Sequence, residues 1–106
     1  MGNNQTKATE KDSSLAAGLL GECYERGELG LKPDLVRAAE LYRQSAVEGC
    51  TCGLYNLGRC QCDGIGIDAN REEGLLRLRL AAVLKGDFWG YDQKAAELLR
   101  QVENRT

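Results

Sequence analysis

The amino-acid sequence predicts an all-α fold, a short right-handed α-solenoid of two antiparallel helix pairs followed by a C-terminal capping helix. One observation is an internal repeat, because Gly21 recurs as Gly58 and Ala38 as Gly74, 37 and 36 residues later. A period of this length is typical of stacked helical repeats, in which one unit cannot bury its apolar face alone. The other is that apolar residues recur at helical spacing between glycine-containing turns. With 106 residues and 42% hydrophobic residues, we expect one small domain.

The first repeat, at about residues 14–49, is expected to follow a tail that forms no regular structure. Residues 1–12 are polar and are predicted to be disordered. Asp12, Ser13 and Ser14 offer oxygens for an N-cap, so we expect the first helix to begin there and to end at Gly27. Its predicted apolar face consists of Leu15, Leu19, Leu20, Cys23 and Tyr24. The turn GELGLK follows, and Pro33 is expected at the first position of the next helix.

The remaining helices repeat this plan up to a predicted cap. The second helix, which ends at Gly49, has an apolar stripe of Leu35, Ala38, Ala39, Tyr42, Ala46 and Val47. The second repeat, at about residues 50–86, has two helices joined by the turn DGIGID, with apolar positions Leu54, Leu57, Gly58 and Cys60, then Leu75, Leu78, Ala81 and Ala82. A last helix carries Tyr91, Ala95, Leu98, Leu99 and Val102. We expect residues 87–106 to cap the domain of residues 13–106, with Phe88 and Trp89 packed over the end of the second repeat.

The segment GCTCGLYNLGRCQCDGIGI resembles the Sel1-like repeat, in which a helix ending in Leu-Gly is followed by a Gly-x-Gly-Val turn. In the first repeat, Leu20 and Gly21 stand at the Leu-Gly position and Leu31 stands at the turn valine. Three positions of the second repeat depart from the pattern, namely Asn70, Gly74 and Leu78. The resemblance implies a protein related to tetratricopeptide arrays, whose first helices line a concave surface that binds other proteins. It therefore implies protein recognition rather than catalysis.

Polar residues on the first helix of each repeat are the predicted partner-binding positions of this concave face. Gly18 shares their spacing, and the set consists of Glu22, Glu25, Arg26, Tyr55, Arg59, Cys62 and Asp63. The alternative is an ordinary solvated helix face, because any amphipathic helix has such residues.

The sequence argues against an enzyme and against a cofactor. It has no histidine, so nucleophiles activated by imidazole are excluded. Adjacent carboxylates such as Glu72 and Glu73 diverge on a helix surface. The net charge of −2, with both signs interspersed, argues against a nucleic-acid partner. We therefore predict a monomeric adaptor that binds a protein or peptide. Without an apolar run of membrane-spanning length or a signal-peptide pattern, we expect it in the cytoplasm.

The five cysteines raise an alternative function. Cys50, Cys52, Cys60 and Cys62 form two Cys-x-Cys pairs that could bind zinc, but the members of a pair on one helix point about 200° apart. We predict no metal site and treat a zinc-binding or purely structural module as the alternative. In the resembling family, secreted members bridge the positions held here by Val47 and Leu54, so the missing bridge favours a reducing compartment. A disulfide between Cys52 and Cys60 is left as an alternative.

The chain start carries a second functional signal. Residues 1–6, MGNNQT, fit the pattern for N-myristoylation, which would place a lipid on Gly2. One myristoyl chain binds a membrane weakly and reversibly, so a protein partner would supply the second anchor. The predicted function is thus an adaptor, tethered or untethered, at the cytoplasmic face of a membrane or in the cytoplasm. An effector that imitates the repeat proteins of a host would use the same surface.

Overall fold

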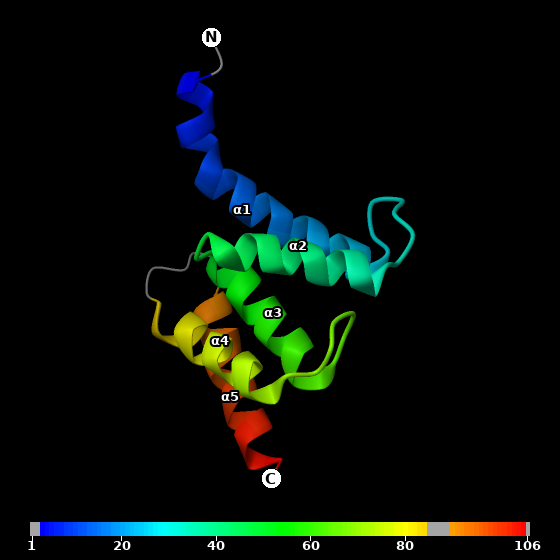
Figure 1. The fold of residues 1–106 in the computed structure, drawn as a ribbon, viewed down its shortest axis with the longest axis vertical. Helices are drawn as coiled ribbons and strands as arrows, with labels where there is room; N and C mark the ends of the chain where they lie inside the picture. Colours follow the sequence, from blue (N-terminus) through cyan, green and yellow to red (C-terminus); the bar gives the residue numbers. More distant parts are fainter. Residues whose placement is uncertain (1–2, 85–89, 106) are drawn as a thin grey trace.

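The computed structural model describes residues 3–84 and 90–105, and within these ranges it contains helices and no strand. The helices are α1 (Asn3–Arg26), α2 (Leu35–Val47), α3 (Thr51–Asp63), α4 (Arg71–Val83) and α5 (Tyr91–Asn104). Each helix packs against the next along the chain, and α3 also contacts α1 and α5 (Figure 1). The predicted all-α repeat solenoid is confirmed. The first helices of the successive units, α1, α3 and α5, form one layer, and α2 and α4 flank it.

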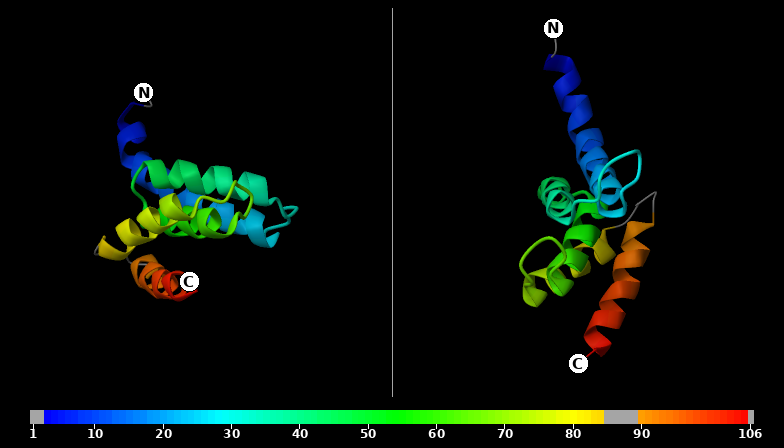
Figure 2. Two further views of the ribbon diagram at one scale, coloured as in Figure 1. Left: turned by 60° about the horizontal axis from the view of Figure 1, so that its bottom comes forward. Right: turned by 90° about the vertical axis from the view of Figure 1, so that its right-hand side faces the viewer.

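The solenoid is elongated, with extents of 54 × 33 × 20 Å. The two chain ends lie at opposite ends of its longest dimension, and α1 extends well beyond the other helices (Figure 2). This projection of the 24-residue helix α1 adds to the length that comes from stacking the repeats.

The start of α1 differs from the prediction. We expected an N-cap at Asp12, Ser13 or Ser14, but the helix is continuous through these residues and begins at Asn3. It therefore includes most of the segment that we expected to be disordered. The physical reason is that residues 3–12 contain no proline or glycine and include alanine, glutamate, glutamine and lysine, which favour a helix.

The second helices of the two repeats begin with matching caps. Asp34 accepts a hydrogen bond from the backbone N–H of Arg37 at 3.0 Å, and Asn70 accepts one from Glu73 at 3.2 Å. Asn70 therefore performs the capping role although it departs from the family's aspartate. Pro33 lies just before the cap rather than at the first helical position, which corrects the prediction. The cap oxygen of Asp34 fixes the start of α2 one residue later.

The buried face of α1 consists of small residues, whereas the sequence suggested leucines. Ser14, Ala17, Gly18 and Gly21 are buried, while Leu15 and Leu19 are half-buried and Leu20 is 38% exposed. A Cβ on Gly21 would lie 2.6 Å from the Tyr42 ring, so α1 and α2 approach too closely for a larger residue. In α2, Leu35 and Val47, which we expected on the buried stripe, are exposed.

Two apolar clusters hold the repeats together. One is built around Tyr42 and Leu57, where α2 meets α3, and the other around Leu54 and Leu78, where α3 meets α4 and α5. Their buried members are Ala38, Tyr42, Leu57 and Cys60, and Leu54, Leu78, Ala81 and Ala95. Because α3 contributes to both clusters, it is the central helix of the fold. The predicted packing of Phe88 and Trp89 lies outside the described residues.

Candidate interaction surfaces

Two of the predicted partner-binding residues, Glu25 and Arg59, form an ion pair between α1 and α3. The Arg59 guanidinium donates to both oxygens of the Glu25 carboxylate at 2.9 and 2.6 Å, and Tyr42 donates to the same carboxylate at 2.6 Å. Burial acts to raise the pKa of Glu25, but the hydrogen bonds from Arg59 and Tyr42 outweigh it and lower that pKa. Burial and the hydrogen bond to this carboxylate raise the pKa of Tyr42. The group is therefore a charged pair that fixes one repeat against the next.

Glu22 joins the three helices of the first layer. Its carboxylate accepts hydrogen bonds from the Asn56 side chain of α3 at 2.9 Å and from the Tyr91 hydroxyl of α5 at 2.8 Å. Arg59 in turn donates to the Asn56 side-chain oxygen at 2.9 Å, which links this carboxylate to the Glu25 pair. We call these five residues and Tyr42 the inter-repeat network. Its carboxylates serve the packing of the repeats.

The other predicted partner-binding residues lie around this network. Arg26 is exposed and approaches Glu28 at 3.8 Å, and Asp63 accepts from Arg105 of α5's C-terminal end at 3.0 Å. Tyr55 packs its ring 5.9 Å from the Tyr91 ring and borders a hollow of about 540 Å³ between α3 and α5.

Gly18 and Cys62 are less available than the sequence suggested. A Cβ on Gly18 would meet the Cys52 sulfur at 2.7 Å, and Gly18 is buried rather than on an open surface. Cys62 is half-buried against Gly74, where an added Cβ would lie 2.7 Å from its sulfur. Contact of a partner with the seven predicted residues stays a prediction.

The cysteines are dispersed rather than gathered. All five are free thiols, so the Cys52–Cys60 disulfide is not formed. Burial raises the pKa of Cys52 to about 12 and that of Cys60 to about 11, so both are protonated at neutral pH. In the part of the chain that the structure describes, no three cysteine or carboxylate residues are placed to hold a metal ion. These thiols fill the core as small apolar groups.

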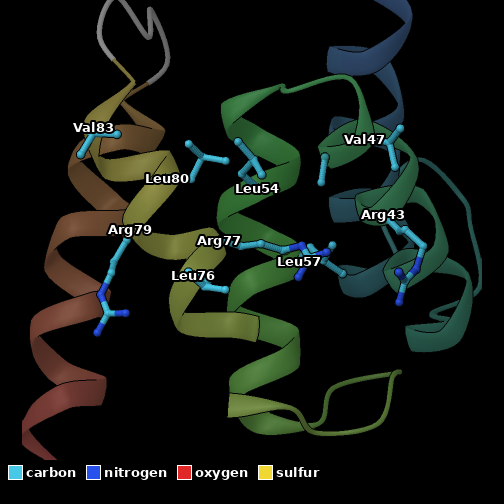
Figure 3. A pocket seen from close by; sticks show the side chains of 10 residues that line it. Arg43, Val47, Leu54, Leu57, Leu76, Arg77, Arg79, Leu80 and Val83 are labelled. Carbon is cyan, nitrogen blue, oxygen red and sulfur yellow. The ribbon is translucent and has the colours of Figure 1, made fainter. Parts of the chain in front are cut away.

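A further hollow of the described surface lies on the other side of the first layer. It is a groove of about 750 Å³ between α2 and α4, with α3 as its floor (Figure 3). The residues that line it, here called the groove residues, are Arg43, Ala46, Val47, Leu54, Leu57, Leu76, Arg77, Arg79, Leu80 and Val83. Among the described helices, α2 and α4 do not contact each other, so the groove stays open to solvent.

Among the described residues, four of the eight exposed large apolar side chains line this groove, and the others, Leu20, Leu29, Leu35 and Val36, lie elsewhere. Leu76, Leu80 and Val83 of α4 are 59%, 48% and 65% exposed, and Val47 of α2 is 76% exposed. The sequence analysis missed this surface because it assigned leucines to the core. The sequence did contain a signal for it. The helix α4 has apolar residues on every side, and a helix of that kind is usually covered by other elements on every side.

A scan of family models matches the Sel1 repeat at residues 14–49 and 53–82. The chain belongs to the Sel1 repeat family. The matched ranges correspond to the α1–α2 and α3–α4 hairpins, so each Sel1 unit is one helix pair, and α5 follows the second unit. Sel1 repeats generally mediate protein–protein interactions and are typically non-catalytic. Searches of curated proteins and of solved structures found no match to the chain.

The structure also bears on the membrane. Among the helices it describes, none has both the length and the apolar character that crossing a bilayer requires. Gly2, the predicted lipidation site, lies outside the described residues, and the rest of its motif, residues 3–6, belongs to α1.

Proposed function

We propose that this Sel1 protein is a non-catalytic adaptor that binds a protein partner in the groove between α2 and α4. The observation that carries the proposal is the set of large apolar side chains exposed at this one place, Val47, Leu76, Leu80 and Val83. Monomeric proteins rarely leave apolar side chains grouped on a surface unless another molecule covers them. A partner that covered this groove would bury apolar surface contributed by both Sel1 units.

The lining of the groove supports binding rather than catalysis. Its side chains are aliphatic or arginine, and it contains no carboxylate, thiol, hydroxyl or imidazole. Nucleophilic catalysis and general acid–base catalysis both need such groups. The proposed function needs no cofactor and no metal ion.

The first-layer face has a supporting role in this proposal. Glu22, Glu25 and Arg59 are engaged in the inter-repeat network, so a partner on that side would have to compete with hydrogen bonds between helices. Tyr55, which borders the hollow beside α5, is the predicted contact residue best placed for a second, smaller contact. The network keeps the two Sel1 units in fixed relative positions, and those positions determine the width of the groove.

In a more specific version of the proposal, the adaptor is also tethered to a membrane, and the MGNNQT motif favours this version. Acylation of Gly2 would give weak membrane affinity, which a groove-bound membrane protein would strengthen. Intact mass and membrane fractionation of the wild-type protein and a Gly2→Ala variant test it. A myristoyl increment lost in the variant supports the tether, and an unmodified wild-type mass rules it out while leaving the adaptor unaffected. The zinc alternative has no geometric support in the described residues.

Site-specific photocrosslinking tests the adaptor function. A photoreactive phenylalanine derivative replaces Leu80 in the groove or, as a matched control, Gln44, which is exposed at the equivalent position of α2. Irradiation in extract of the protein's own cells should give a discrete protein adduct at residue 80 that is absent at residue 44. Equal adducts at both positions, or no adduct at residue 80, would contradict the proposal.

A further inference from the structure

We infer that the partner segment is an amphipathic α-helix with an apolar face and acidic residues beside it. This inference rests on the proposed function and names the class of partner. It depends on two properties of the groove, the spacing of its apolar residues and the sign of its charge.

The apolar residues of α4 are spaced to receive a helix. Leu76, Leu80 and Val83 lie at positions i, i+4 and i+7, so they form a stripe along about two helical turns. The opposite face of the same helix, with Leu78 and Ala81, is fully buried in the core. A helix with apolar residues on both faces packs against elements on both sides, and the outer side of α4 has none among the described residues.

The two walls and the floor complete a trough rather than a flat patch. Figure 3 shows Leu80 and Leu54 facing the hollow from α4 and α3, with Val47 on the α2 wall. A trough between two helices and over a third is the shape into which a further helix packs with its apolar side down. The end of the trough that holds Leu80, Leu54 and Val47 is apolar.

The charge of the groove is positive although the chain is not. The groove residues include Arg43, Arg77 and Arg79 and no carboxylate, whereas the whole chain has a net charge of −2. Figure 3 shows Arg43 and Arg77 on opposite walls of the groove, at the end near Leu57 and Leu76. Acidic side chains of a partner would meet positive charge from both walls there.

The three arginines differ in how far their charge is already paired with carboxylates of the same chain. Arg77 donates to the Glu73 carboxylate at 3.1 Å and to Gln61 at 3.0 Å, and Arg79 donates to Glu103 at 3.1 Å. Arg43 makes no hydrogen bond or ion pair with a described residue, but it acts on Glu73 at longer range: hydrogen bonds from Gln61 and Arg77 lower the pKa of that carboxyl most, and the charge of Arg43 lowers it further. Arg43 is thus the cation most available to an acidic partner.

Two other occupants fit the groove less well. A second copy bound symmetrically through this same surface would bring the same arginines of both copies together, and its groove lining offers no carboxylate to pair with Arg43. The chain's own residues 1–12 have only Met1 and Ala8 as apolar residues, and their side-chain charges cancel. Neither supplies an apolar stripe with acidic neighbours.

The internal repeat provides a matched variant for the test. Leu76 and Leu80 occupy the positions held in the first repeat by Glu40 and Gln44, which are exposed and polar. The double variant Leu76→Glu/Leu80→Gln therefore writes first-repeat residues into the second repeat. It should keep the far-UV circular dichroism and melting temperature of the wild type, because neither leucine belongs to a core cluster.

The probe is a display library of 18-residue helical peptides that is randomised without charge bias and selected on the wild-type protein. Enriched peptides should carry apolar residues at i, i+3 or i+4, and i+7, with an excess of aspartate and glutamate. For a synthesised winner, Leu76→Glu/Leu80→Gln should weaken binding by about tenfold or more, because it removes buried anchors. Arg43→Glu should weaken it by about tenfold and reduce its salt dependence. A control variant, Glu40→Gln/Gln44→Ala, should bind like the wild type.

Three results would overturn the inference: winners that are neutral or basic, winners that bind the double variant equally well, or a library from which no groove-dependent peptide emerges. The adaptor function fails separately, because its test is the crosslink from residue 80. A discrete protein adduct there, combined with any of these three results, would retain the adaptor and reject the acidic helix as its partner.

Discussion

Replacement of Arg59 by methionine should destabilise the protein by about 2–3 kcal/mol. The variant removes two hydrogen bonds to Glu25 and one to Asn56, while the aliphatic part of the side chain is retained. Breaking a fully buried ion pair costs about 3–5 kcal/mol and an exposed pair about 1 kcal/mol or less. Both side chains of this pair are 21% exposed, so an intermediate value nearer the buried limit is expected.

Urea denaturation followed by circular dichroism measures this change. A loss of about 2–3 kcal/mol corresponds to a fall of about 10–15 °C in the melting temperature of a domain of this size. Arg26→Met is the matched control, because Arg26 is also an arginine of the first layer but has a 62% exposed side chain. Its effect should stay within about 0.5 kcal/mol.

The destabilisation should also depend on pH. The pKa of Glu25 is lowered in the folded state from its ordinary value of 4.5, so the pair contributes stability above pH 4.5 that is lost as the pH falls through the lowered pKa. The difference between wild type and Arg59→Met should therefore be largest near neutral pH and should shrink in acid. Two results would refute the assignment of an ion pair between the repeats. One is a stability difference between wild type and Arg59→Met that is the same in acid as at neutral pH, and the other is a loss of stability at neutral pH as small as that of Arg26→Met.

Three further predictions concern packing, thiol chemistry and the cap. Gly53→Ala should cost about 1–3 kcal/mol by denaturant unfolding, because the added Cβ would meet the α2 backbone at 2.4 Å, and a loss below 0.5 kcal/mol would contradict the close approach. Native alkylation at about pH 8 should spare Cys52 and Cys60, whose buried thiols have raised pKa values, as peptide mass spectrometry will show. Tyr91→Phe should remove the hydrogen bond to Glu22 and speed hydrogen exchange in α5, whereas unchanged exchange would show that apolar packing alone docks this helix.

The fold could be predicted from the sequence because the repeat itself carries the information. The period of 36 to 37 residues and the glycine turns are local features that need no tertiary knowledge. The start of α1 could not be located in this way. An N-cap motif such as Asp12-Ser13-Ser14 marks the start of a helix only when the residues before it disfavour helix, and residues 3–12 favour it.

The sites were harder to predict because helical spacing does not tell which face is open. Glu22, Glu25 and Arg59 were assigned to an open face, yet the close approach of α1 and α3, permitted at Gly18, brings them into one hydrogen-bond network. Leu76 and Leu80 fit a helical pattern equally well as core residues. Their exposure depends on the separation of α2 from α4, which is a tertiary property.

The comparison between the two Sel1 units gives the groove its functional meaning. Both second helices have the same length and the same type of N-cap, and each contacts two helices of the first layer. At equivalent outer positions, however, one helix has Glu40 and Gln44 and the other has Leu76 and Leu80. The surroundings of these positions differ, because Gln44 lies beside Ser13 and Ser14 of α1, whereas Leu76 and Leu80 line the groove opposite α2. A partner segment bound in the groove, as proposed, would cover these leucines, and the arginines beside them would favour an acidic one.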